Sequence, residues 1–128
     1  MRILLYDHDG TGHHLEYAGH LAAFLRDQGD EVSFASWDRP SRPGDPIIDQ
    51  PLGDVTHLAH EGSGDRLARV GAWPLARAQG VHRCLRLGSR GEADVIHFLF
   101  LDRSGLGLLA SLSLRSTKAA VFGTLFHP

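Results

Sequence analysis

Apolar residues follow two patterns along the chain, one typical of strands and one typical of helices. Short apolar or alternating runs predict five strands, at residues 2–7, 31–36, 54–58, 94–101 and 119–126. Apolar residues at i, i+3 and i+4 spacing predict three helices, at residues 14–28, 65–88 and 104–114. Because the strands alternate with helices, the sequence predicts an α/β fold with a doubly wound, mainly parallel sheet of about five strands.

Glycines and prolines indicate where these elements end. Gly29 follows the first predicted helix and suits its C′ position, because glycine enters the left-handed region without steric cost. Four prolines within residues 37–53 exclude a regular element longer than a turn or two. Pro74 predicts either a kink in the second helix or the start of a new one. The apolar runs at 94–101 and 119–126 predict strands that are buried on both faces of the sheet.

The composition is that of an ordinary globular domain. The 128 residues suffice for a single domain, 1–128, with one sizeable core. Hydrophobic residues make up 42% and charged residues 22%, and no apolar run is long enough to span a membrane. The single cysteine, Cys84, excludes an internal disulfide and is expected in the core, and the default location is the cytoplasm.

Charge is distributed unevenly along the chain. Residues 1–65 hold 12 acidic and 4 basic residues, whereas residues 66–128 hold 3 acidic and 9 basic residues. Four residues share one face of the second predicted helix if it continues past Pro74: Arg66, Arg69, Trp73 and Arg77. This basic face is either an ordinary solvated surface or a peripheral contact with an anionic membrane. Nucleic acid is not expected as a partner, because the net charge is −2 and the basic segment holds one aromatic residue.

A loop rich in glycine and histidine follows the first strand and leads into the first helix. It consists of Asp9, Gly10, Thr11, Gly12, His13 and His14. Glycines let a ligand approach the backbone closely, and the N-terminus of the following helix favours an anion. The sequence therefore predicts a phosphate-bearing or sugar ligand near residues 8–14.

Polar residues also follow other strands of the predicted sheet. In parallel sheets, ligands bind beyond the carboxyl ends of the strands. The residues expected there are Asp7, His8, Asp9, Asp102, Arg103 and His127. Asp7 and Asp9 either bind sugar hydroxyls, act as a base or only orient the loop.

Two groups of histidines call for different interpretations. A metal site is not expected, because His13 and His14 are adjacent on a helix and point apart, and a metal needs three or four convergent ligands. His97, inside the predicted strand 94–101, is expected to be half-buried and hydrogen-bonded rather than a ligand.

Two familiar α/β sites fit poorly and one remains an alternative. The dinucleotide fingerprint requires a third glycine where this chain has Leu15. A receiver domain requires a lysine at the end of its fifth strand, whereas Lys118 precedes the last strand. A methyltransferase would use Gly10 and Gly12 with an acidic residue such as Asp38 after the second strand, and this reading stays open.

Three segments together resemble the N-terminal, acceptor-side domain of GT-B glycosyltransferases. The opening strand, Gly-Thr-Gly loop and helix resemble the start of that domain. Residues 94–97, Asp-Val-Ile-His, resemble its Asp-Val-Val-His strand, and residues 123–128 resemble the strand ending in Thr-x-x-His of retaining glycosyltransferase family 4. The Gly-Thr-Gly-x-His element also resembles inverting GT-B enzymes that build peptidoglycan precursors, so the stereochemical outcome is left open.

This resemblance implies a Rossmann-like N-terminal half of an enzyme that moves a sugar from a nucleotide sugar to an acceptor hydroxyl, without a cofactor. It implies that Gly10 and Gly12 approach the donor diphosphate and that His127 is catalytic, near the reacting sugar. The other expected donor- or substrate-binding residues are Asp9, Thr11, His13, His14, Asp102 and Arg103. We expect a fragment that lacks the C-terminal nucleotide-binding domain and does not turn over alone. The alternatives are a non-catalytic sugar- or nucleotide-binding α/β module and an S-adenosylmethionine-dependent methyltransferase.

Overall fold

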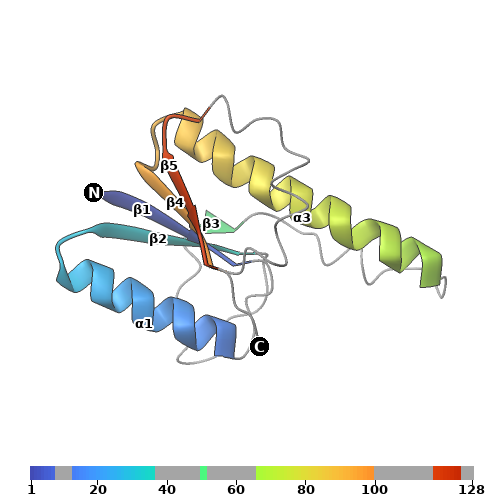
Figure 1. The fold of residues 1–128 in the computed structure, drawn as a ribbon, viewed down its shortest axis with the longest axis horizontal. Helices are drawn as coiled ribbons and strands as arrows, with labels where there is room; N and C mark the ends of the chain where they lie inside the picture. Colours follow the sequence, from blue (N-terminus) through green and yellow to red (C-terminus); the bar gives the residue numbers. More distant parts are fainter. Residues whose placement is uncertain (8–12, 37–49, 52–65, 100–116, 125–128) are drawn as a thin grey trace.

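The computed structural model describes residues 1–7, 13–36, 50–51, 66–99 and 117–124 (Figure 1). Side chains are described for all of these residues except His13, residues 50–51 and residues 66–77. The elements follow one another as β1 (Arg2–Tyr6), α1 (His13–Asp27), β2 (Glu31–Ser36), β3 (Gln50–Pro51), α3 (Arg66–Ser89), β4 (Val95–Phe98) and β5 (Ala120–Gly123).

The described strands form one parallel sheet with the order β3-β2-β1-β4-β5. The chain moves outward from β1 to β2 and β3 and then returns past β1 to β4 and β5. The direction therefore reverses between β1 and β4, which is the switch point where open α/β sheets bind ligands. The prediction of an α/β fold with a parallel sheet is confirmed, and the arrangement is compatible with a Rossmann-like fold.

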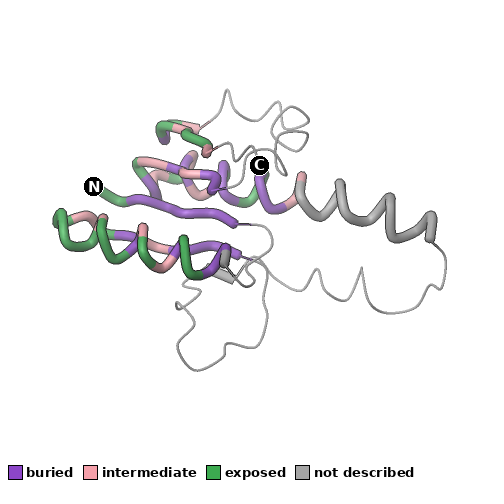
Figure 2. Tube along the Cα trace, turned by 60° about the horizontal axis from the view of Figure 1, so that its bottom comes forward, coloured by how far each residue is buried: buried purple, intermediate pink, exposed green. Residues whose placement is uncertain are grey.

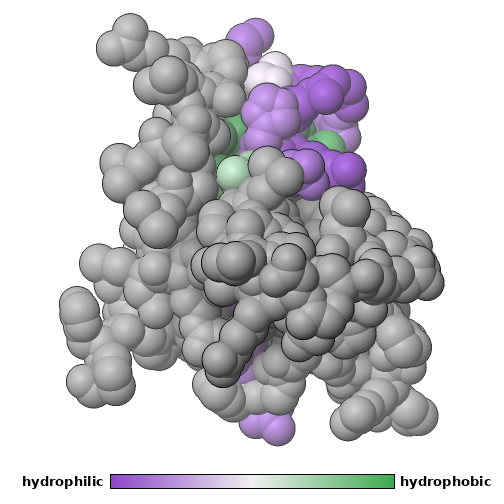
Figure 3. All heavy atoms as spheres, turned by 90° about the vertical axis from the view of Figure 1, so that its right-hand side faces the viewer, coloured by the Kyte–Doolittle hydropathy of each residue, from purple (hydrophilic) through white to green (hydrophobic). Residues whose placement is uncertain are grey.

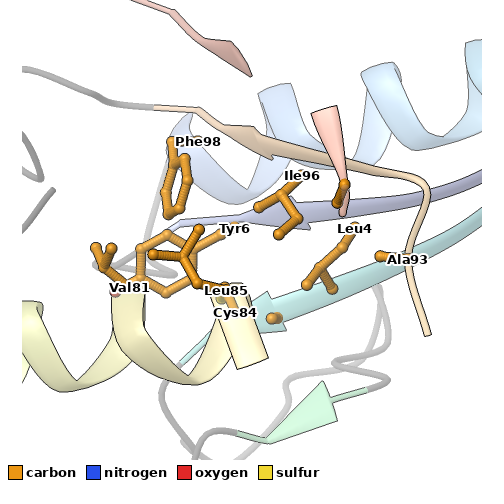
Figure 4. Close-up of a cluster of buried hydrophobic side chains, with 10 residues drawn as sticks. Leu4, Tyr6, Val81, Cys84, Leu85, Ala93, Ile96 and Phe98 are labelled. Atoms are coloured by element: carbon orange, nitrogen blue, oxygen red, sulfur yellow. The ribbon is translucent and has the colours of Figure 1, made fainter. Parts of the chain in front are cut away.

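Helix α3 packs on one face of the sheet. Alternate residues of a strand point to opposite faces, and Leu4 and Tyr6 of β1 meet Val81 and Leu85 of α3 (Figure 4). The ring of Tyr6 also packs edge-on against that of Phe98, with ring centroids 5.4 Å apart. The cluster also contains Ala35, Cys84, Ala93, Ile96 and Ala119. As expected, Cys84 is a core residue, and burial raises the pKa of its thiol.

Helix α1 covers the opposite face of the sheet. Ile3 and Leu5 of β1 and Val32 and Phe34 of β2 form the sheet side of this second cluster. The helix contributes Leu15, Ala18 and Ala22, at the spacing that gives a helix one buried side. Figure 2 shows buried residues concentrated in the central strands and along one side of α1.

Both helices end with a glycine in the left-handed region. Gly29 has a φ of 88°, and the amides that follow α1 bond back to its last turn, Gly29 N to Arg26 O at 2.9 Å and Asp30 N to Leu25 O at 3.1 Å. This Schellman pattern confirms the C′ position predicted for Gly29. Gly91, with a φ of 74°, ends α3 in the same way.

The structure decides between the two possibilities for Pro74 and differs from the sequence prediction at one strand. Helix α3 continues through Pro74 as one element, so no second helix begins there; a proline removes a single hydrogen bond, and the long flanking segments keep theirs. Strand β3 occurs at Gln50–Pro51, within the proline-containing segment. It pairs with β2 in the described sheet and stands at its edge, where proline is tolerated. The strand predicted at 54–58 and the helix predicted at 104–114 lie outside the described residues.

The prediction that the last strand is buried on both faces is wrong for the described part of β5. Ala120, Phe122 and Gly123 are exposed, whereas Val121 packs against the core on the α3 side. The cause is position in the sheet: within the described structure β5 pairs with β4 only and stands at the edge opposite β3. The apolar run indicates a strand, but it does not indicate what covers that strand.

Candidate functional site

A polar layer follows the apolar core where β1 and β2 end, on the side of the sheet that α1 covers. Along this side Ile3 pairs with Val32 and Leu5 with Phe34. The register continues one step further, because the amide of Asp7 donates to the carbonyl of Ala35 at 3.2 Å. By the same alternation, Asp7 and Ser36 extend the two buried stripes at the carboxyl edge of the sheet.

Helix α1 brings a histidine to this layer. The Nδ1 atom of His14, in the first turn of α1, lies 3.2 Å from Oδ2 of Asp7. The contact has ion-pair distance but lacks the alignment of a hydrogen bond. Asp7 is 2% exposed and His14 is 6% exposed, so the pair is buried in a medium that screens charges poorly.

Ser36 completes the cluster. Its residue is 1% exposed, and within the described structure its Oγ has no hydrogen-bond partner. Burying a hydroxyl without a partner is costly, and most buried polar groups in native proteins are satisfied. Three buried polar side chains at the carboxyl ends of β1 and β2, next to the switch point between β1 and β4, therefore define the candidate functional site: Asp7, His14 and Ser36.

A second polar contact lies nearby in the sheet, between β4 and the residue that follows β5. The Nε2 atom of His97 is 2.8 Å from the hydroxyl oxygen of Thr124. His97 is partly buried, as expected from the sequence, and burial lowers its pKa below the ordinary value. This contact ties the two strands together, which is a structural role.

The lowered pKa of His97 predicts a pH-dependent stability. The unfolded chain takes up a proton on this ring at a higher pH than the folded chain, so stability falls as the pH drops below about 6.5. His97→Gln removes this titration. We expect the unfolding free energy of the original protein to fall more between about pH 7.5 and about pH 5 than that of the variant, in urea titrations. Equal pH dependence in the two proteins would assign the effect to other groups.

Asp94 lies at the amino ends of the strands, directly before β4, whereas the candidate site lies at their carboxyl ends. Its carboxylate accepts hydrogen bonds from the backbone amide of Arg2 at 2.8 Å and from Nη2 of the same residue at 2.7 Å. The Arg2 guanidinium holds the pKa of Asp94 below its ordinary value. This pairing joins the starts of β1 and β4, so Asp94 is a structural residue remote from the candidate site.

The structure places some of the predicted site residues and not others. His14 lies in the buried cluster beside Asp7, and His13 begins α1 with a side chain that is not described. The remaining predicted residues lie outside the described part of the chain: Asp9, Gly10, Thr11, Gly12, Asp102, Arg103 and His127.

Sequence reasoning missed Ser36. A signal was present, because a polar residue continues the buried stripe of Val32 and Phe34 where β2 ends. Asp7 carries the same signal after Ile3 and Leu5. A polar side chain at the last position of a buried stripe thus indicates a ligand-facing edge.

The described residues form neither a metal cluster nor a membrane-spanning helix. Among the described residues, no three histidine, cysteine, aspartate or glutamate side chains are grouped to hold a metal ion. Within the same part of the chain, neither helix is both long and apolar enough to cross a bilayer. Seen from the right-hand side of Figure 1, where α3 begins, the described residues that are visible are mainly hydrophilic, with some hydrophobic ones among them (Figure 3). The basic face predicted from Arg66 to Arg77 falls on side chains that are not described.

No protein-family model matches the sequence, and the curated proteins contain no match.

Proposed function

We infer that the chain is the N-terminal, acceptor-side domain of a nucleotide-sugar-dependent glycosyltransferase of the GT-B type, which moves a sugar to an acceptor hydroxyl. The observation that carries this proposal is the buried cluster of Asp7, His14 and Ser36 at the carboxyl ends of β1 and β2, next to the switch point of a parallel sheet. A carboxylate, an imidazole and a hydroxyl are groups that hydrogen-bond to the hydroxyls of a sugar.

The topology supports the same proposal. The segment Asp-Val-Ile-His, which resembles a strand of these enzymes, runs through β4, and β4 pairs directly with β1. The glycine-containing segment starts directly after Asp7 and leads to His14. The residues of the resemblance and those of the buried cluster therefore meet at neighbouring strands.

Under this proposal the chain works with a second domain that holds the nucleotide. The 128-residue chain alone is not expected to transfer a sugar. His127, Asp102 and Arg103 would complete the site from other strand ends, with no metal or cofactor required. The protein would be cytoplasmic. Peripheral membrane contact through one helix face would use Arg66, Arg69, Trp73 and Arg77. This requires a helix that is continuous past Pro74, as α3 is.

A ligand titration tests the proposal against its alternatives. Amide signals of the 128-residue protein, labelled with nitrogen-15, are followed by NMR while UDP-glucose, GDP-mannose or S-adenosylmethionine is added. We expect one of the nucleotide sugars to shift the amides of Asp7, His14 and Ser36, with weak affinity because the proposal assigns nucleotide binding to a second domain. Saturable micromolar binding of S-adenosylmethionine would overturn the proposal in favour of a methyltransferase.

The natural reading frame gives the second test. We expect the gene to continue beyond codon 128 into a second Rossmann-like half with paired glutamates. The whole encoded polypeptide should then release nucleoside diphosphate from a nucleotide sugar when a hydroxyl acceptor is present. A stop codon directly after Pro128 would instead favour a non-catalytic binding module.

A further inference from the structure

The N-terminus of α1 faces the same edge of the sheet as the buried cluster. Helix α1 is 15 residues long, and the free amides of its first turn give this end a partial positive charge. Such an end next to a glycine loop commonly receives a phosphate. In this protein, however, the carboxylate of Asp7 reaches His14 in the first turn of α1 and is buried with it.

We propose that Asp7 is the internal counter-anion of the α1 N-terminus, and that the buried cluster of Asp7, His14 and Ser36 therefore accepts neutral hydroxyl groups of a ligand and excludes phosphate. The carboxylate already supplies the negative charge that the helix end and an imidazolium would attract. A phosphate entering beside it would meet a like charge in a poorly screened environment. A neutral hydroxyl carries no net charge, so the carboxylate does not repel it.

Ser36 is an independent observation that points to a ligand here. Its Oγ is buried, has no hydrogen-bond partner among the described residues, and ends the stripe of Val32 and Phe34 that faces α1. A hydroxyl can both donate and accept, so it complements another hydroxyl at whichever rotation the ligand presents. A ligand hydroxyl would satisfy this group, and the carboxylate of Asp7 is an acceptor for a second one.

Of the two ligand classes that the glycine loop predicts, a phosphate-bearing and a sugar ligand, the buried cluster takes the sugar hydroxyls. The donor diphosphate that the resemblance assigns to Gly10 and Gly12 is expected outside this cluster. The inference rests on the proposed function for the identity of that ligand as a sugar. The exclusion of phosphate is a separate property of Asp7 and is tested without any nucleotide sugar.

The test compares inorganic phosphate with neutral hexoses. Amide signals of the labelled protein are recorded during titrations with phosphate, glucose and mannose at constant ionic strength. For the original protein we expect a hexose, and not phosphate, to shift the amides of Asp7, His14 and Ser36 in a saturable way. Asp7→Asn removes the charge at nearly constant shape and should raise phosphate affinity at least about tenfold.

Glu16→Gln is the matched control for this test. Glu16 is also an acidic residue near the start of α1, but it is exposed, so solvent screens its charge. Glu16→Gln should leave phosphate binding unchanged, which separates the buried charge from the overall charge of the protein.

Each outcome decides the proposal. Saturable phosphate shifts at the three cluster amides of the original protein would overturn it, as would an Asp7→Asn variant that folds but gains no phosphate affinity. A lack of shifts with both hexoses would overturn the hydroxyl part. If Asp7→Asn does not fold, the original protein still tests the proposal, because the proposal predicts amide shifts with a hexose and none with phosphate. None of these outcomes depends on whether the nucleotide-sugar test of the proposed function succeeds.

Discussion

Phe98→Ala is expected to lower the free energy of unfolding by about 3–5 kcal/mol. Phe98 is 0% exposed and lies in the core between the sheet and α3. Truncation removes the buried ring and leaves a cavity that a densely packed interior refills only in part. It also removes the edge-on contact with Tyr6, in which the rings are inclined by 75°. Because small domains are stable by only about 5–15 kcal/mol, this loss should be visible as a much lower urea midpoint.

Phe122→Ala is the matched control for this prediction. Phe122 lies on the neighbouring strand β5, but it is 59% exposed. The same chemical change at that position should cost well under about 1 kcal/mol, because little apolar surface leaves water when the strand folds. Both variants are measured by urea titration with circular dichroism. Equal midpoint shifts would show that Phe122 is as buried as Phe98 in solution, in contradiction to the structure.

The central elements were predictable because local sequence carries their signal. Strand β2 occurs at residues 31–36 as expected, and α1 differs from its expected range by one residue at each end. The alternation of Ile3, Leu4 and Leu5 between the two core clusters is the pattern of a strand covered on both faces. Gly29 was predictable too, because a C′ position selects glycine for its own backbone conformation.

Features that depend on distant neighbours were not predictable. The apolar residues of β5 and those of β4 look alike in sequence, yet Phe122 is exposed because its strand stands at the edge of the described sheet. Likewise, the sequence left open whether Pro74 kinks the helix or starts a new one, and the continuous α3 excludes the new start. Local patterns indicate the type of an element, whereas its burial is decided by tertiary packing.

In the candidate site, too, the local features were predictable and the contacts between distant residues were not. His14 and Asp7 could be singled out because they flank a glycine loop after a strand, and the structure brings their side chains together. Their partner Ser36 comes from β2, and only the parallel register places it beside Asp7. A site assembled from several strand ends is visible in the sequence only as separate polar residues.

Gly88 is another residue whose role comes from distant neighbours, and Gly88→Ala is expected to destabilise the protein by about 1–3 kcal/mol. Gly88 lies in the last turn of α3, where the helix passes close to the sheet. A Cβ atom there would clash with Oγ1 of Thr117 and lie 2.8 Å from Cβ of Ala119 and 2.9 Å from Cδ1 of Ile96. Real Cβ atoms essentially never approach other atoms so closely, so the helix or the sheet must move.

The intrinsic preference of helices for alanine opposes this cost, by up to about 1 kcal/mol, and the net sign is set by packing. A double-mutant cycle isolates the packing part. Thr117→Ala removes the nearest clashing atom, although it also removes the hydrogen bond that the amide of Ala119 donates to Oγ1 at 3.2 Å. We expect Gly88→Ala to cost less when Thr117 is already alanine, with a coupling of about 0.5 kcal/mol or more.

Gly91→Ala provides the comparison, because it tests a glycine that is required for a different reason. A Cβ at Gly91 would meet nothing within 4 Å, but its φ of 74° lies in the left-handed region, which costs about 1–2 kcal/mol for a residue with a side chain. Its effect should be the same with Thr117 or alanine at position 117. If the urea titrations show coupling to Thr117 for Gly91 and none for Gly88, then α3 does not approach the sheet at Gly88 as described.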